Sequence, residues 1–213
     1  MDISALTGIV ALVIYVVLAL IALWGAFCVV MVWMRVAQKR FRSEDAQDEF
    51  LAALEEPLRK ADFSAAELLC EGDPRAIPQL AYLAVTSRKV GYSRVRQLVV
   101  DHFERDVLAD LEYRLSWVNT VIKAAPMVGL LGTVLGMMGA FAKLHASEHV
   151  EPTQLSGDIS LALITTACGL AIAIPLVLCT ASINVRIRKM EDLVAVGLNR
   201  FFEAFRPAVG KSG

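Results

Sequence analysis

Three threonines, Thr133, Thr165 and Thr166, stand inside two charge-free stretches of the chain, residues 124–142 and 159–185. A threonine hydroxyl both donates and accepts hydrogen bonds, so at membrane depth it can order water or contact a titrating carboxylate. Each stretch also carries a proline and several glycines. A helix that only anchors a protein has no need of such residues. We therefore predict that the two stretches pack closely together and line something polar.

Small residues form a stripe along each stretch. Successive positions on an α-helix are about 100° apart, which places four glycines of the first stretch within an arc of about 80°. Small residues four apart let helix backbones approach each other in lipid. The stripes consist of Gly129, Gly132, Gly136 and Gly139, with Thr133 at the edge, and of Ala162, Thr166, Gly169, Ala173 and Thr180. The alternative is that both stripes only pack, with each hydroxyl bonded to a carbonyl of its own helix.

Asp, Glu, Lys, Arg and His are missing from both stretches and from a third, residues 3–34. Proton relays through membranes ordinarily use ionisable side chains, which are costly there and so usually functional. If this protein conducts protons, the titrating carboxylate must therefore come from a different polypeptide. Thr133 and Thr166, with Thr165 beside them, are our candidates for an ion pathway that contacts this group or orders water around it.

Other kinds of chemistry find little support. The run that begins at Gly129 lacks the Gly-Lys-Ser/Thr ending of a phosphate-binding loop, and no nucleophile stands beside a suitable base. His145 and His149, beside acidic residues, could in principle hold a metal, but a solvated loop is the favoured interpretation. The net charge of −1 offers no basic surface for nucleic acid, and the four cysteines show no CxxC spacing. We expect no enzyme, no metal and no cofactor.

Three membrane spans account for the composition, which is 56% hydrophobic. A span needs about 20 apolar residues, and residues 8–34, 124–142 and 159–185 each suffice. The first is a poor signal peptide because its apolar run is too long and Asp2 replaces a basic start. The sequence predicts an all-α integral membrane protein in a lipid bilayer.

The positive residues near the ends of the spans predict the orientation. Lys and Arg gather after the first span, before the second and after the third, whereas the opposite side is mostly acidic. We therefore expect the following order: periplasmic N-terminus and first span in 1–34, a cytoplasmic helical domain in 35–123, the second span in 124–142, a periplasmic loop in 143–158, the third span in 159–185, and a cytoplasmic C-terminal helix and tail in 186–213.

Apolar periodicity continues past the second and third spans. No proline occurs between Ser93 and Pro126, and apolar residues recur there at spacings of 3 and 4. We predict one helix from about 93 to 142 and a last helix that stops near Pro207. The alternative is a set of short helices with breaks at the membrane surface.

Two motifs resemble the MotA/TolQ/ExbB proton-channel family, and within it the three-span ExbB and TolQ branch. They are the segment from Ala125-Pro126 through Gly129, Gly132-Thr133 and Gly136, and the segment from Ala162 through Thr165-Thr166 and Gly169 to Pro175. The resemblance implies a pentamer in the bacterial inner membrane around two copies of a single-span partner similar to ExbD or TolR. It implies that Thr133 and Thr166 face an intramembrane aspartate of that partner, and that Pro126 and Pro175 are the family's membrane prolines. Proton flow would then pass work to a protein similar to TonB or TolA.

Leu161 departs from this pattern, because the branch commonly carries a glutamate at that position. The departure leaves the choice between proton and sodium open. Two other functions also remain: a stator for flagellar rotation or gliding, against which three spans count, and a membrane scaffold that conducts nothing.

Overall fold

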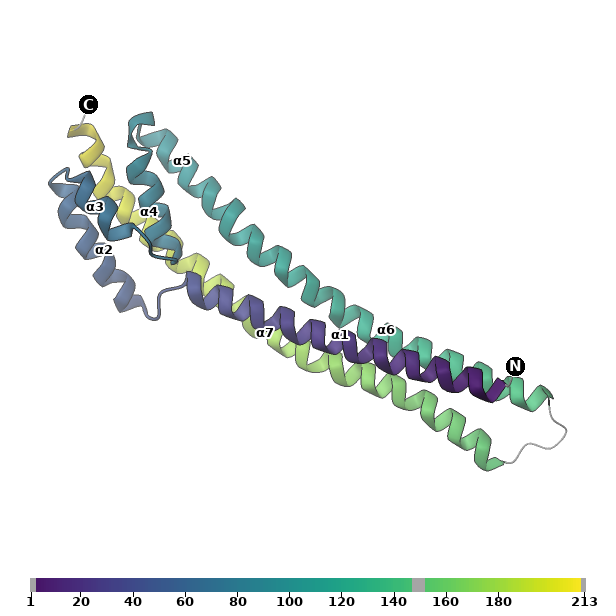
Figure 1. Cartoon of the computed structure of the whole chain (residues 1–213). Helices are drawn as coiled ribbons and strands as arrows, with labels where there is room; N and C mark the ends of the chain where they lie inside the picture. The colour runs from purple at the N-terminus through teal and green to yellow at the C-terminus, as the bar shows by residue number, and fades with distance from the viewer. Residues whose placement is uncertain (1–2, 147–151, 212–213) are drawn as a thin grey trace. The chain divides into compact units, whose positions relative to one another are not determined.

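The computed structural model describes residues 3–146 and 152–211, which are helical apart from short turns (Figure 1). The helices are α1 (Ile3–Lys39), α2 (Glu44–Arg59), α3 (Phe63–Cys70), α4 (Ala76–Thr86), α5 (Tyr92–His102), α6 (Ala109–Ala146) and α7 (Pro152–Lys211). In these ranges no strand occurs, and three helical segments are long and apolar enough to cross a membrane: Gly8–Lys39, Tyr92–Ala142 and Ile159–Val209. The prediction of an all-α membrane protein is confirmed.

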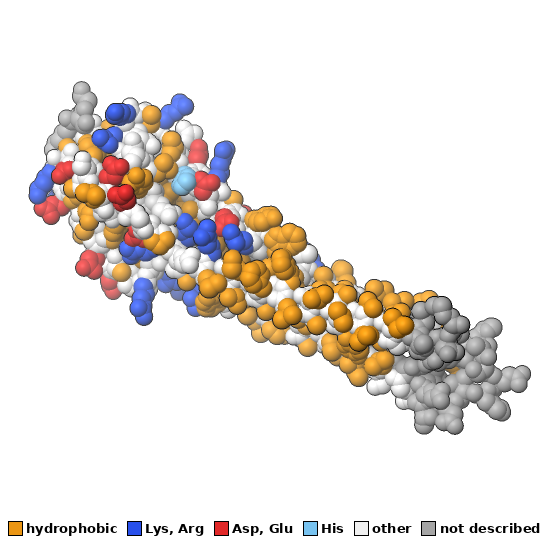
Figure 2. Space-filling view, viewed as in Figure 1, with side chains coloured by type: hydrophobic (Ala, Val, Ile, Leu, Met, Phe, Trp, Pro, Cys, Tyr) orange, Lys and Arg blue, Asp and Glu red, His pale blue; other side chains and the backbone are white. Residues whose placement is uncertain are grey.

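The chain divides into two compact units, each described by itself below. The membrane unit comprises residues 1–31 and 114–182, and the polar unit comprises residues 32–113 and 183–213. Figure 2 shows hydrophobic side chains over the visible face of the membrane unit and charged side chains gathered on the polar unit.

The membrane unit consists of parts of α1, α6 and α7 lying side by side, with α6 running opposite to α1 and α7 (Figure 1). Large apolar side chains point outward from all three helices, such as Leu12, Leu130 and Leu163, with exposed fractions of 64%, 58% and 58%. Small residues such as Gly129 and Gly169 lie between the helices, together with a few larger side chains such as Leu18 and Leu176, which are 2% and 8% exposed. This is the packing expected in lipid, where association depends on close backbone approach rather than on burying apolar surface.

The core of the polar unit is built on an apolar stripe of α2. Leu51, Leu54 and Leu58 recur at spacings of 3 and 4 and are at most 2% exposed. Ser43 caps the start of α2 by accepting a hydrogen bond from the backbone N–H of Ala46 at 3.2 Å. Aromatic rings from α3 and α7 complete this core: Phe63 and Phe205 meet edge to face, and Phe201 stacks on Phe205.

Two glycines set the turns of the polar unit. Gly72, between α3 and α4, has a φ of 77°, and Gly91, directly before α5, has a φ of 90°. These backbone angles are strained for residues with a Cβ, so glycine lets the chain end one helix and start the next within a few residues.

The helices differ in extent from the sequence expectations. A π-helical turn, Phe103–Leu108, joins α5 to α6, so the backbone stays helical from Tyr92 to Ala146 but is not one regular α-helix. Because α6 continues to Ala146 and α7 begins at Pro152, helix covers much of the expected loop 143–158, and residues 147–151 lie outside the described part. Polar residues beyond a charge-free run can still be helical.

The expectation that the last helix stops near Pro207 is wrong, because α7 continues to Lys211. The Pro207 side chain is exposed, and the following residue, Ala208, is 2% exposed. Burial of Ala208 in the polar unit holds the final turn in place despite the proline.

Candidate functional site

Glycines bring the backbones of α6 and α7 into direct contact within the membrane unit. A methyl group added at Gly129 would lie 2.7 Å from the carbonyl oxygen of Thr165, and one added at Gly169 would lie 2.5 Å from that of Ala125. Real Cβ atoms essentially never come this close, and a backbone atom cannot move aside. The predicted stripes of small residues therefore face each other, and they include Gly132 and Gly136, where an added methyl would meet Thr165 and Ala162.

The three predicted threonines meet at this contact. The hydroxyls of Thr133 and Thr166 are in direct hydrogen-bond contact across the two helices. The carbonyl oxygen of Gly129 lies 3.0 Å from the Thr166 Oγ1 and 3.1 Å from the Thr165 Oγ1. The Thr133 hydroxyl lies 3.3 Å from the same carbonyl and 3.2 Å from that of Ala162. One cluster thus joins three hydroxyls and two carbonyls.

The number of hydroxyl protons limits how this cluster can be bonded, because each hydroxyl donates one hydrogen bond. One arrangement uses all three protons: Thr165 donates to the Ala162 carbonyl at 2.7 Å, Thr166 donates to Gly129, and Thr133 donates to the Thr166 oxygen. The Thr133 oxygen then keeps its acceptor capacity. The cluster can therefore accept a proton donor at Thr133 without losing its internal hydrogen bonds.

The packing alternative raised from the sequence is met in part. Thr165 does bond to the carbonyl of Ala162 in its own helix, as packing hydroxyls do. Thr165 and Thr166 also reach across to Gly129 of α6. These hydroxyls therefore connect two helices rather than only satisfying one.

Pro126 and Pro175 lie inside α6 and α7 respectively. A proline has no N–H, so the carbonyl four residues earlier loses its helical donor. For Pro126 that carbonyl belongs to Ile122. Each proline thus weakens its helix locally, and Pro126 lies at the α6–α7 contact, since a methyl group added at Gly169 would lie 3.2 Å from its Cα.

Several other residues from the sequence analysis take less direct positions. Gly139 lies in α6 and is partly buried, while Leu161 lies on α7 and is 44% exposed. Thr180 is buried, and its hydroxyl has no hydrogen-bond partner in the part of the chain that the structure describes. No group of His, Cys, Asp or Glu side chains able to hold a metal occurs among the described residues. His149 lies outside them.

Gly25 of α1 is a packing residue that the sequence analysis did not identify. A methyl group there would lie 2.8 Å from Val121 of α6 and 2.9 Å from Leu176 of α7, so all three helices meet at this point. The available signal was a glycine in the middle of the first apolar stretch, at a position where lipid-facing helices usually carry larger residues.

The comparisons with known proteins match the part of the chain that holds this cluster. The model of the MotA/TolQ/ExbB proton channel family covers residues 83–195, more than half of the chain. The chain belongs to this family. The matched region runs from the end of α4 into α7 and so includes all three threonines.

Individual relatives come from both named branches. The chain is 40% identical over 96 residues to the biopolymer transport protein ExbB of Helicobacter pylori, covering 45% of this chain and 66% of the relative. It is 33% identical over 106 residues to the Tol-Pal system protein TolQ of Haemophilus influenzae, covering 49% and 46%. It is 33% identical over 118 residues to ExbB of Aquifex aeolicus, covering 53% and 78%. The match covers about two thirds of the Helicobacter pylori relative and about half of the Haemophilus influenzae relative.

Proposed function

We propose that this chain is the membrane channel subunit of an ion-driven motor, which uses the proton motive force to energise a process of the bacterial envelope. In this proposal Thr133, Thr165 and Thr166 border the ion pathway at the α6–α7 contact. The observation that carries it is the cross-helix hydroxyl cluster in a part of the membrane unit that has no acid of its own.

The missing acid determines what the partner must supply. We propose a single-span protein similar to ExbD or TolR, whose intramembrane aspartate takes up and releases protons beside Thr133. The free acceptor capacity of the Thr133 oxygen suits the protonated carboxyl, which donates a hydrogen bond. When the carboxyl has released its proton, the carboxylate can accept a hydrogen bond donated by the Thr133 hydroxyl, so the same hydroxyl serves both states.

The remaining assignments of the proposal concern assembly and placement. Five copies would surround two copies of the partner in the inner membrane, with the N-terminus in the periplasm. The distribution of Lys and Arg supports this orientation. Import driven through a TonB-like protein and envelope maintenance through a TolA-like protein are the two processes that relatives named ExbB and TolQ suggest.

The test is co-expression with a single-span protein of the ExbD or TolR type that carries an intramembrane aspartate, followed by purification and by measurement of proton flux into reconstituted vesicles. We expect a stable complex of fixed stoichiometry and a flux that dissipates a pH gradient. Thr133→Val and Thr166→Val should abolish the flux and leave the complex intact, whereas Thr133→Ser should keep it. A chain that purifies without any partner bearing an intramembrane acid would contradict the proposal.

Other results would favour the alternatives. If both valine variants conduct normally, the hydroxyls only join α6 to α7 and the chain is a scaffold or conducts elsewhere. If the purified complex supports flagellar rotation or gliding rather than envelope energisation, the motor assignment stands and the process is wrong.

A further inference from the structure

Two leucines of α3 are exposed on the surface of the polar unit. Leu68 is 72% exposed and Leu69 is 45% exposed. Lipid does not account for this exposure, because α3 lies outside the three segments that are long and apolar enough to cross a membrane. This helix also lies outside residues 83–195, so it is not part of the region that matches the family model. The exposure of the two leucines therefore needs another explanation.

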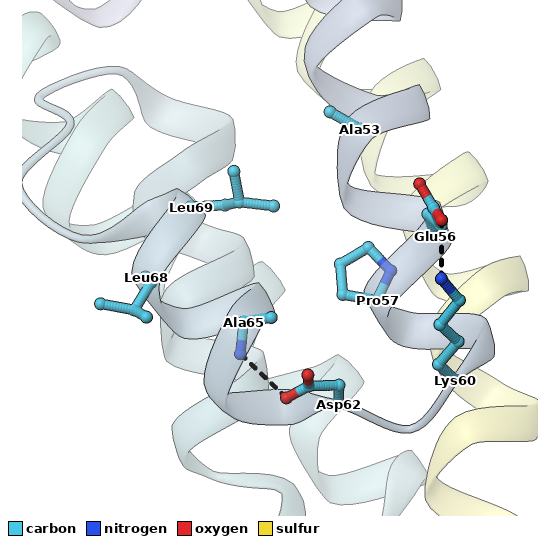
Figure 3. A pocket seen from close by; sticks show the side chains of 8 residues that line it. All are labelled: Ala53, Glu56, Pro57, Lys60, Asp62, Ala65, Leu68 and Leu69. Atoms are coloured by element: carbon cyan, nitrogen blue, oxygen red, sulfur yellow. Dashed lines mark hydrogen bonds and ion pairs between the residues drawn. The ribbon is translucent and has the colours of Figure 1, made fainter.

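Both leucines line a pocket of about 500 Å³ between α2 and α3. Leu69 on α3 and Pro57 on α2 extend toward each other across it (Figure 3). The Glu56–Lys60 ion pair, at 2.7 Å, and Asp62 form its polar side. An exposed apolar patch with a polar rim is typical of a surface that binds another molecule. The volume is sufficient for large apolar side chains of a peptide.

A second pocket, of about 460 Å³, lies at the C-terminal end of α3. None of the residues that line it is basic. The Gln79 side-chain oxygen in this pocket already accepts a hydrogen bond from Lys39 at 2.6 Å. Glu71, which has no ion pair within residues 3–146 and 152–211, and the exposed Tyr82 ring remain to meet a ligand. A carboxylate and an aromatic ring in one pocket suit a Lys or Arg side chain.

Residues 53–82, which form both pockets, carry an excess of negative charge. They include six acidic and three basic residues. All three basic residues, Arg59, Lys60 and Arg75, are already paired with carboxylates of the same segment. Glu67 on α3 also has no ion pair in the part of the chain that the structure describes. The C-terminal end of α3 adds partial negative charge and has no basic residue in its last turn. The charge that a partner meets here is therefore negative.

We propose that the two pockets form one docking site for a basic, apolar segment of a partner protein. Its apolar side chains fill the α2–α3 pocket, and a Lys or Arg side chain binds at Glu71 and Tyr82. Charge complementarity decides for this occupant. A second copy of the chain would bring the same negative surface to the contact, and an anionic bilayer surface would repel it. The docking site adds a protein contact to the proposed channel and does not depend on ion conduction.

Thiol footprinting on the full-length chain in phosphatidylcholine nanodiscs tests the site. The four native cysteines are replaced, and one cysteine is introduced at Ala53, which lines the α2–α3 pocket, or at Ala52, which does not. The probe is the hexapeptide Lys-Lys-Leu-Leu-Lys-Lys at millimolar concentration. We expect the peptide to slow the reaction of Ala53→Cys with a water-soluble maleimide by at least about fivefold, because only a filled pocket hides this thiol. The reaction of Ala52→Cys should stay unchanged.

Further substitutions separate the contributions of the two pockets. Added to the Ala53→Cys protein, Leu69→Ser should raise the peptide concentration needed for half protection about tenfold, because apolar burial is lost. Glu71→Gln should raise it about threefold, and only at low salt. The controls are Val196→Ser and Glu104→Gln, which remove an exposed apolar side chain and an exposed carboxylate elsewhere on the polar unit. Neither control should change the protection.

Several results would overturn the docking site. Protection of both cysteines or of neither would show that the peptide does not bind in the pocket. Equal protection by Lys-Lys-Ser-Ser-Lys-Lys would remove the apolar contact, and equal protection by Glu-Glu-Leu-Leu-Glu-Glu would remove the choice of a basic partner. A slow reaction of Ala53→Cys before peptide is added would mean that lipid or a second copy already covers the pocket. None of these rates depends on proton flux, so the docking site and the proposed function can fail separately.

Discussion

The side-chain amide of Gln47 on α2 donates a hydrogen bond to the backbone carbonyl of Leu193 on α7 at 2.8 Å. Gln47 is 4% exposed, so a buried polar group is satisfied across two helices of the polar unit. The close approach of α2 to α7 depends on Gly197, since a methyl group there would lie 2.8 Å from the Gln47 nitrogen and 2.5 Å from the Ile77 Cδ1.

Gly197→Ala should therefore destabilise the polar unit by about 1–3 kcal/mol through overpacking, less the gain of about 1 kcal/mol in helix propensity. The measurement is the apparent melting temperature of the detergent-solubilised protein. Adding Ile77→Val, which removes the Cδ1, should recover part of the loss. An exposed α7 change, Val196→Ala, serves as control, and a Gly197→Ala protein as stable as wild type would refute the contact.

The loss of stability caused by a glycine-to-alanine change in the membrane unit should depend on what the new methyl group would meet. At Gly169 and Gly129 it meets backbone, which cannot move, so Gly169→Ala and Gly129→Ala should lower the apparent melting temperature most. At Gly25 it meets the side chains of Val121 and Leu176, which can rotate, so the effect there should be smaller. A methyl group added at Gly8 or Gly157 would meet no atom within 4 Å, so Gly8→Ala and Gly157→Ala are the matched controls. Equal losses at Gly169 and Gly8 would contradict this packing.

Arg75 makes the polar unit sensitive to acid. Its guanidinium donates to both oxygens of Asp73, at 2.9 Å from Nε, and these hydrogen bonds lower the pKa of the Asp73 carboxyl. The carboxylate is favoured in the folded state, so the stabilisation is present above the ordinary aspartate pKa and is lost as pH falls through the lowered value.

Arg75→Gln should accordingly flatten the fall of the apparent melting temperature between about pH 5 and pH 3. Arg75 also stacks on the ring of Phe41 at 4.0 Å, so the variant should be less stable at every pH. The change of the melting temperature with pH, rather than its absolute value, then reports the contribution of the Asp73 carboxylate. Lys60→Gln removes a partner of Glu56 on the exposed surface, which is worth little, and should leave the slope nearly unchanged. An unchanged acid slope in Arg75→Gln would count against the pair.

Cys70 should be chemically inert. Burial, with a smaller contribution from Asp73, raises the pKa of its thiol to about 12. At pH 8 about one thiol in ten thousand is then ionised, so a thiol reagent should react more than about a thousandfold more slowly than with an ordinary exposed cysteine. The comparison uses a protein with Cys70 as the single cysteine against one with Ala52→Cys on the exposed side of α2. Similar rates would show that Cys70 is accessible.

The surface of the polar unit also carries a pocket of about 500 Å³ between α2 and α3, lined by Pro57, Leu68 and Leu69 and by the Glu56–Lys60 ion pair (Figure 3). Leu68 is 72% exposed there. The Cys70 experiment keeps this region in its native form, because neither variant alters a residue that lines the pocket.

The sequence was sufficient to predict three apolar helices and the close packing of the second against the third, because small-residue stripes and charge-free runs are local patterns. It could not predict that three hydroxyls surround the Gly129 carbonyl oxygen, because this arrangement depends on the axial register of α6 against α7.

The α6–α7 contact has a genetic consequence. At Gly136 an added methyl would lie 2.7 Å from the Cβ of Ala162, so this pair has room for one methyl group and is indifferent to which helix carries it. A Gly136→Ala lesion should thus be suppressed by Ala162→Gly on the opposite helix, as a reciprocal exchange. Lesions at Gly129 and Gly169 face backbone and should have no such single-site suppressor. The pattern of reversion would separate contacts between side chains from contacts between main chains.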